Sequence, residues 1–200
     1  MNNHNSHLKI ENNVKSNPCI DKLTDLEYLE HMIPHHQVAI DMSVLLQKHT
    51  SSDVMLNLCR EIIRIQSYEI FEMSKMKAYK DTLFTDDKWI KEKINTKLDT
   101  YNPILSKAKE GECNPLFFKP NDHSQHMKGM KLTDRSYLEH MIPHHQVAID
   151  MSRRLLLHTN NSYLLEFCRK LIVSQQSEIL YMNNLLMNID FLYKSELLQN

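Results

Sequence analysis

The chain has 200 residues, of which 42% are hydrophobic, and its 24 basic and 25 acidic residues leave a formal net charge of -1. A chain of this length can bury a real core, whereas the balanced charge offers no basic stripe for nucleic acid. No stretch approaches the roughly 18 apolar residues that suggest a membrane-spanning helix, and the N-terminal segment is polar. We therefore expect a soluble globular protein that contacts neither nucleic acid nor membrane, with an intracellular location favoured over export.

The counts of single residue types favour helices and point to unusual chemistry. Only 2 glycines and 6 prolines leave little material for the tight turns of an all-β fold. The 4 cysteines are widely spaced without a C-x-x-C pair, which argues against a disulfide framework and against a zinc knuckle. The 12 methionines and 12 histidines are well above ordinary usage, and most lie in or beside one repeated segment.

That repeated segment divides the chain. The sixteen letters YLEHMIPHHQVAIDMS occur identically at 28–43 and at 137–152, and weaker agreement at the same offset extends well beyond them. Each copy has the length of a two-helix hairpin. We therefore expect a single bundle domain, divided in chain order into a flexible polar tail (1–21), a first helical hairpin (22–81), a connector (82–131), a second hairpin (132–193) and a C-terminal tail (194–200).

Within each copy, capping residues and apolar periodicity predict two helices. Thr24 with Glu27 has the spacing of a capping box, whereas the second copy has Ser136 in place of the glutamate and should have a weaker cap. A turn near 49–53 or 158–162 should end the first helix, and the second should cover about 54–80 or 163–188. Pro34 and Pro143 should either kink the first helix or begin a new one.

Two hairpins that each have one apolar face can cover each other. The expected fold is therefore all-α, a ferritin-like four-helix bundle made of two duplicated hairpins joined by a long connector.

Helical spacing places histidine and methionine side chains together on the face that should be buried. Met32 lies one turn before His35 and His36, and Met73 with Met76 forms a second sulfur pair on the following helix. Imidazole and thioether ligands together suit Cu(I) or Ag(I). The second copy repeats this pattern with Leu185 in place of Met76; its candidate ligands are Met141, His144, His145, Met151 and Met182.

Glutamine and glutamate on the second helix of each copy project into the same stripe. Gln66 and Glu69, like Gln175 and Glu178, have the chemistry to hydrogen-bond the imidazole rings and fix their tautomers. From the residues alone, core packing is the favoured role for Met42 and Met151, since methionine at helical spacing usually fills gaps. The copper prediction is therefore centred on the histidines, with copper as Cu(I) preferred.

Two other functions are weighed against metal binding. In the first, the His/Gln/Glu cluster is a buried hydrogen-bond network that gives a structural or interaction bundle its register. In the second, the protein is a metalloenzyme, but no Glu-x-x-His pair lies at a core position and no H-E-x-x-H motif occurs. We expect no catalytic residue and a metal ion as the partner, and the sequence leaves protein partners and self-association open.

The repeated motif resembles a known family. HMIPHHQVAIDMS followed by Q-x-x-E-x-x-x-M is similar to the signature of domain-of-unknown-function family 305, in both copies. That resemblance implies a ferritin-like helical bundle, and one studied branch of the family consists of exported copper-binding proteins linked to copper resistance. It adds Met42 to the candidate ligands and supports the rest: Met32, His35, His36, Met73, Met141, His144, His145, Met151 and Met182.

Overall fold

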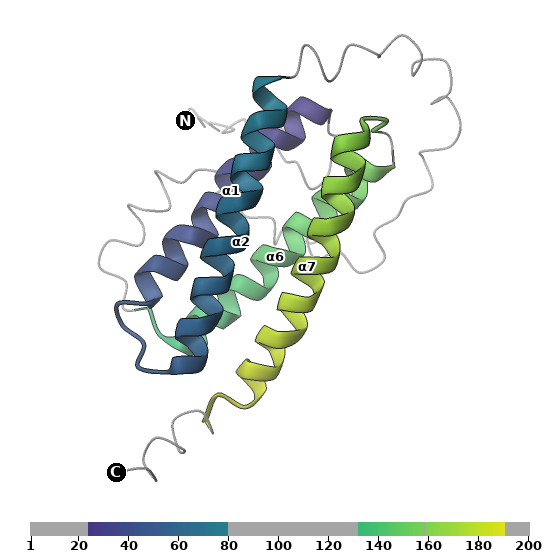
Figure 1. Ribbon diagram of the computed structural model, residues 1–200. Coiled ribbons are helices and arrows are strands. Elements are labelled where there is room, and N and C mark those ends of the chain that lie inside the picture. The colour runs from purple at the N-terminus through teal and green to yellow at the C-terminus, as the bar shows by residue number, and fades with distance from the viewer. Residues whose placement is uncertain (1–23, 80–131, 158, 191–200) are drawn as a thin grey trace, which may run out of the picture.

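Four helices make up the described part of the protein. The computed structural model describes residues 24–79, 132–157 and 159–190, so the predicted tails and connector lie outside the described residues. No strand occurs within these three ranges. The helices are α1 (Asp25–Leu46), α2 (Asp53–Ala78), α6 (Asp134–Leu156) and α7 (Ser162–Met187). The predicted all-α four-helix bundle is confirmed (Figure 1).

Both first helices begin with a complete capping box. The Thr24 side chain accepts from the Glu27 amide, and the Glu27 carboxylate accepts from the Thr24 amide at 2.9 Å. In the second copy the Ser136 hydroxyl oxygen accepts from the Thr133 amide at the same distance. The shorter serine therefore accepts from the same N-cap amide as the glutamate does, although without its charge, and the threonine hydroxyl accepts from the second amide in both copies.

Both helices continue through their prolines, so no new helix begins there. Pro34 lies inside α1 and Pro143 inside α6. Proline has no amide hydrogen, so the Glu30 carbonyl loses its usual helical partner, at a cost of roughly 3 kcal/mol. Met32 and His35 on either side of Pro34 are fully buried. Tertiary packing of the flanking turns thus holds the segment helical.

The two hairpins meet through their first helices. The most extensive helix contacts join α1 to α2, α6 to α7, and α1 to α6. The Tyr28 hydroxyl lies 2.7 Å from the Ser152 hydroxyl, and the Ser43 hydroxyl lies 2.7 Å from that of Tyr137. Because the start of each helix contacts the end of the other, α1 and α6 are antiparallel and related by a pseudo-twofold axis (Figure 1).

The interior has three tiers along the bundle. The cluster around Met32 contains the buried hydrophobic side chains Tyr28, Leu29, Met32, Met73, Met76, Val147, Ala148, Met151, Leu155, Leu164, Phe167, Cys168 and Leu171. The cluster around Met141 contains the buried side chains Val38, Ala39, Met42, Leu46, Met55, Leu58, Cys59, Ile62, Leu132, Tyr137, Leu138, Met141, Met182, Leu185 and Ile189. Between them along every helix lies a polar layer of His35, His36, Gln66, Glu69, His144, His145, Gln175 and Glu178, all buried except the partly buried Glu178.

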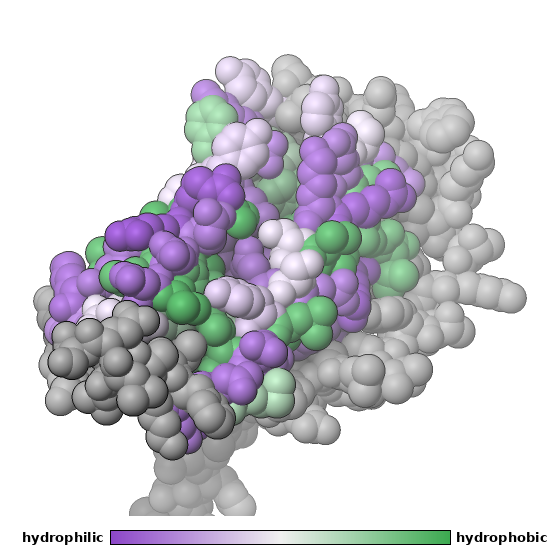
Figure 2. Space-filling model, turned by 60° about the horizontal axis from the view of Figure 1, so that its bottom comes forward, coloured by the Kyte–Doolittle hydropathy of each residue, from purple (hydrophilic) through white to green (hydrophobic). Residues whose placement is uncertain are grey.

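Outside this core, the surface is mixed. Figure 2 shows patches of hydrophobic side chains between hydrophilic ones on the face drawn there. Among the residues that the structure describes, no helix is both long and apolar enough to cross a bilayer.

Candidate metal centre

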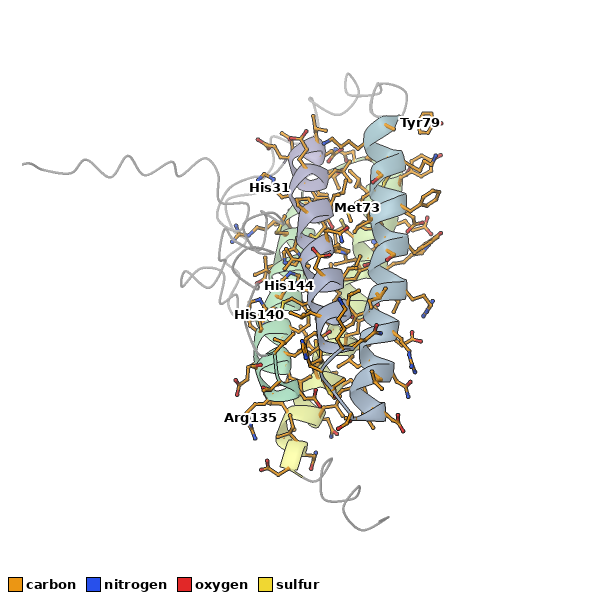
Figure 3. All side chains as sticks on the ribbon, turned by 90° about the vertical axis from the view of Figure 1, so that its left-hand side faces the viewer. His31, Met73, Tyr79, Arg135, His140 and His144 are labelled. Carbon is orange, nitrogen blue, oxygen red and sulfur yellow. The ribbon has the colours of Figure 1, made fainter. Side chains whose placement is uncertain are left out.

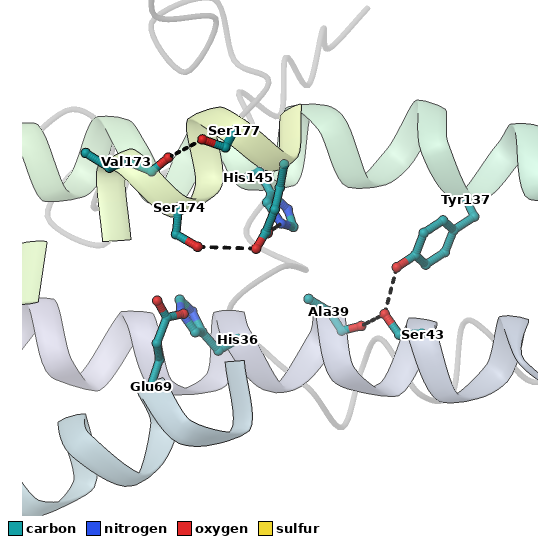
Figure 4. Close-up of polar contacts among 10 residues, drawn as sticks. His36, Ala39, Ser43, Glu69, Tyr137, His145, Val173, Ser174 and Ser177 are labelled. Atoms are coloured by element: carbon teal, nitrogen blue, oxygen red, sulfur yellow. Dashed lines mark hydrogen bonds and ion pairs between the residues drawn. The ribbon is translucent and has the colours of Figure 1, made fainter. Parts of the chain in front are cut away.

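Each copy holds one histidine of the polar layer against a carboxylate. His36 Nε2 lies 2.8 Å from Glu69 Oε2, and His145 Nε2 lies 2.6 Å from Glu178 Oε2 (Figure 4). Both rings are fully buried, and the two carboxylate side chains are only 10% and 14% exposed. Each glutamate projects from the second helix of its hairpin, one turn beyond a glutamine, so the stripe predicted from the sequence does face the histidines.

This contact determines what the other ring nitrogen offers. A neutral imidazole that donates its Nε2 hydrogen to a carboxylate has a lone pair on Nδ1. The Nδ1 atoms of His36 and His145 are buried, and no described residue hydrogen-bonds to them. An imidazole held by a carboxylate on one side, with a buried lone pair on the other, has the arrangement of a metal-ligating histidine.

The other two histidines lie on the pseudo-twofold axis. The rings of His35 and His144 stack with centroids 3.6 Å apart and planes 23° from parallel. Burial lowers the pKa of both rings well below the usual range, and neighbouring histidines, among them His36 and His145, lower it further. His35 and His144 are therefore neutral at physiological pH, as stacked rings 3.6 Å apart need to be.

Gln66 and Gln175 do not have the contacts predicted for them. Both side chains are 1% exposed, yet neither amide nitrogen nor amide oxygen has a hydrogen-bond partner among the described residues. The carboxylates of Glu69 and Glu178 contact the imidazoles instead. A buried amide without a partner costs about 1–3 kcal/mol, so a water or an ion beside these groups would be stabilising.

The candidate methionines separate into two sets, each drawn from both copies. Met32 and Met73 of the first copy share their cluster with Met151 of the second. Conversely, Met141 and Met182 share theirs with Met42. Figure 3 shows Met73 on the side of α2 that faces α1. Helical spacing predicts the pairs within one copy, but the antiparallel crossing of α1 and α6 is what brings in the third methionine.

The two halves of the interior are not chemically identical. Met76 lies in the cluster around Met32, and Leu185 takes the equivalent place in the cluster around Met141. The two halves also differ at their carboxylates. The Ser174 hydroxyl donates to Glu178 Oε1 at 3.3 Å, whereas the first copy has Ile65 at the matching position.

These donors fit a soft ion better than a hard one. Within the described ranges, no three His, Cys, Asp or Glu side chains converge on a point that could hold a metal ion. Among the described residues, thioether sulfur and amide oxygen are therefore the donors that remain to complete coordination beside His36 or His145. Methionine sulfur selects Cu(I) and similar ions rather than Zn²⁺ or Mg²⁺.

Two symmetric clusters of tyrosine hydroxyl and cysteine thiol groups were not predicted from the sequence. Tyr28 and Ser152 contact Cys168, and Tyr137 contacts Cys59 in the symmetric place. Burial raises the pKa of both thiols to about 12, while the hydroxyl hydrogen bonds act in the opposite direction. Both thiols are thus protonated packing groups. The tyrosine and the serine stand in both copies of the motif, but the sequence gives no sign that they pair between copies.

Known proteins share the motif and the architecture. A family model described as "Domain of unknown function (DUF305)" matches residues 25–186. "Uncharacterized protein L153" of Acanthamoeba polyphaga mimivirus is 40% identical over 55 residues, which is 28% of this chain and 36% of that protein. The match therefore spans little more than a third of that relative. The family match confirms the resemblance that the repeated motif indicates.

Solved structures of similar fold include metal-bound ones. CopM in a silver-bound form is 26% identical with a TM-score of 0.58, over 84% of this chain and 98% of that one. CopM in its Cu(I)-bound form is 27% identical with a TM-score of 0.53, over 83% and 97% of the two chains. A DUF305 fragment from Deinococcus radiodurans, 20% identical with a TM-score of 0.53 over 82% and 95%, supports the fold alone.

Proposed function

Because the chain belongs to the DUF305 family, a domain of unknown function, we propose that it binds a soft metal ion, copper as Cu(I), and sequesters it inside the bundle. The CopM structures of the same fold, described as silver-, Cu(II)- and Cu(I)-bound, support this choice of ion. No catalytic step is part of the proposal.

The observation behind the proposal is that the Nδ1 atoms of His36 and His145 are buried and have no hydrogen-bond partner among the described residues. Each ring is oriented by a glutamate, and no described residue donates a hydrogen bond to Nδ1. A buried hydrogen-bond acceptor without a donor lowers the stability of the folded state, unless a water or a cation interacts with it. A cation satisfies such a lone pair, and the fixed ring orientation lowers the entropy cost of binding it.

Two ion positions follow from the pseudo-twofold arrangement. His36 lies one helical turn after Met32, so the first proposed position combines His36 with Met32 and its cluster partners Met73 and Met151. His145 follows Met141 at the same spacing, so the second combines His145 with Met141 and its cluster partners Met182 and Met42. His35 and His144 lie between them and are neutral, so they add no charge repulsion toward a cation. Met76 adjoins the first position only, which makes the two positions chemically unequal.

The test is an anaerobic Cu(I) titration of the reduced protein against a coloured Cu(I) chelator. We expect stoichiometric uptake, and the double variant His36→Ala/His145→Ala should lose at least about tenfold in affinity. The matched control is His31→Ala/His140→Ala, which removes the equivalent histidine pair of the same helices from partly exposed positions. The control should bind copper as the unmodified chain does.

Two results would contradict the proposal. One is that the unmodified chain binds Cu(I) no more tightly than about 1 μM. The other is a double variant that loses stability while the unmodified chain shows no uptake, since that is the behaviour of a purely structural His/Gln/Glu network.

A further inference from the structure

The cluster around Met32 extends toward the end of α2 through Met76. This residue follows Met73 by three positions and therefore lies one turn further along the same side of the helix. Figure 3 shows Met73 and Tyr79 on α2, and Met76 lies between these two in the sequence. Met76 is 8% exposed, whereas Met32, Met73 and Met151 are fully buried. Within this cluster, Met76 is thus the methionine that contacts solvent.

The equivalent end of the second hairpin is apolar. Leu185 stands in the place of Met76, and Leu186 follows it where the first copy has Lys77. Leu185 is buried in the cluster around Met141, and Leu186 packs against that cluster. Every methionine in this cluster is at most 2% exposed. Hydrocarbon therefore stands in the second copy where the first has a thioether that contacts solvent.

An ion pair borders Met76 in the first hairpin. Lys77 Nζ lies 3.2 Å from Glu30 Oε1, and the two side chains are 43% and 47% exposed. The pair joins α2 to α1 at the end of the hairpin where Met76 lies. Exposed ion pairs contribute little to stability, so this one can open at low cost. In the second copy the equivalent Glu139 lies 3.9 Å from Arg135 of its own helix instead.

We propose that Met76 is the residue through which a soft cation enters and leaves the first ion position, and that the second position exchanges its ion more slowly. The inference rests on the proposed copper binding and adds a difference in rate between the two positions. A thioether at the boundary with solvent can take the ion from water and pass it to Met73 one turn away. The ion then keeps a sulfur ligand as it loses its water.

Leu185 provides no ligand at the matching place. A cation that passes a hydrocarbon side chain gives up its water without a replacement, which is costly. The extra thioether should thus lower the barrier at one position and leave the other barrier high.

Met76 should change rates and leave affinity unchanged. The dissociation constant is the ratio of the exit rate to the entry rate, so a residue that eases both steps equally does not alter it. Met32 and Met73 differ in this respect, because the proposed function places them at the bound ion. Their loss should lower affinity.

Withdrawal of Cu(I) by an excess of coloured chelator measures the exit rates. The sample is the full chain, loaded with Cu(I) under anaerobic conditions, and the chelator is raised until the rate no longer depends on its concentration. The unmodified chain should release its copper in two phases. His145→Ala keeps the first position and should show the fast phase alone, whereas His36→Ala should show the slow phase alone.

Exchanging the residues at the two equivalent positions gives the matched variants. Met76→Leu should slow the fast phase at least about tenfold, and Leu185→Met should speed the slow phase by a similar factor. Both variants should keep the Cu(I) affinity of the unmodified chain within about threefold. Met55→Leu is the control, because it removes a fully buried thioether and should leave the fast phase unchanged. Circular dichroism should show native helix content in all three.

Four results would overturn the inference. The loaded chain may not release all of its copper at one rate, and neither Met76→Leu nor Leu185→Met may leave its phase unchanged. Met76→Leu must also not lower affinity as much as Met32→Leu does, since Met76 would then be a ligand of the bound ion. Each of these results leaves the proposed copper binding intact, whereas a chain that takes up no Cu(I) contradicts both.

Discussion

His36 and His145 differ from ordinary buried histidines because only one of their two nitrogens is satisfied by described residues. Adjacent histidines on a buried face can be predicted from helical spacing, and so can a glutamate on the opposing helix. The sequence does not predict which ring nitrogen contacts the carboxylate. It also does not predict that Gln66 and Gln175 have no hydrogen-bond partner among the described residues. Those contacts depend on side-chain rotamers that only the packed bundle determines.

The stacked pair of His35 and His144 predicts a stability that falls in mild acid. Burial first, then nearby histidines, hold the pKa of both rings well below 6.5. Below pH 6.5 the unfolded chain therefore binds protons that the folded chain does not, and the free energy of unfolding decreases as pH falls. The expected slope is about 1.4 kcal/mol per pH unit for each ring until its folded pKa is reached.

Urea denaturation of the metal-free chain at several pH values measures this slope. The series runs from about pH 7.5 to about pH 5, on both sides of the ordinary histidine pKa of about 6.5. In the double variant His35→Gln/His144→Gln, the free energy of unfolding should depend much less on pH. An equal slope in variant and unmodified chain would show that these two rings are not the cause.

At the scale of the helices, the bounds of all four elements could be predicted closely from capping residues and apolar periodicity. The pairing of helices within each hairpin could also be predicted, whereas the way in which the two hairpins pack on each other could not. The identical faces of 28–43 and 137–152 would pack equally well on several neighbours, and it is the Tyr–Ser hydrogen bonds that reveal the antiparallel α1–α6 crossing. The prolines likewise suggest a break that the buried turns on either side prevent.

Tyr137→Phe tests that crossing. The Ser43 hydroxyl donates to the Ala39 carbonyl at 2.7 Å, so the Tyr137 hydroxyl is the donor in their shared contact. Removing it leaves the Ser43 oxygen without that donor in a fully buried place, and we expect a loss of about 1–2 kcal/mol in the free energy of unfolding. Guanidinium denaturation measures it. The exposed Tyr68→Phe is the control and should be nearly neutral; equal effects would contradict the role given to this contact.

For the molecule as a whole, the three tiers could be predicted only in part. The sequence shows a polar stripe amid apolar residues in each copy. That Met151 packs in the same cluster as Met32 and Met73 follows only from the tertiary arrangement of the helices. The proposed ion positions are thus each built from both copies, although the ligand list by itself suggests one position per copy.

Methyl NMR of methionine during Ag(I) titration distinguishes these two arrangements. Met151→Leu should weaken the same ion position as Met32→Leu, so that the Met73 methyl signal no longer shifts in either variant while the Met182 signal still does. Loss of the Met182 shift in Met151→Leu would instead assign each position to one copy alone.

The duplication has a consequence for how the two halves can change. In an assembly of two identical hairpins, every substitution appears twice and symmetry is preserved by necessity. A single chain with two copies is released from that constraint, and this one has kept 28–43 and 137–152 identical while Ile65 and Ser174, or Met76 and Leu185, have diverged. Each half can therefore change its own side chains while the two halves share a common interior.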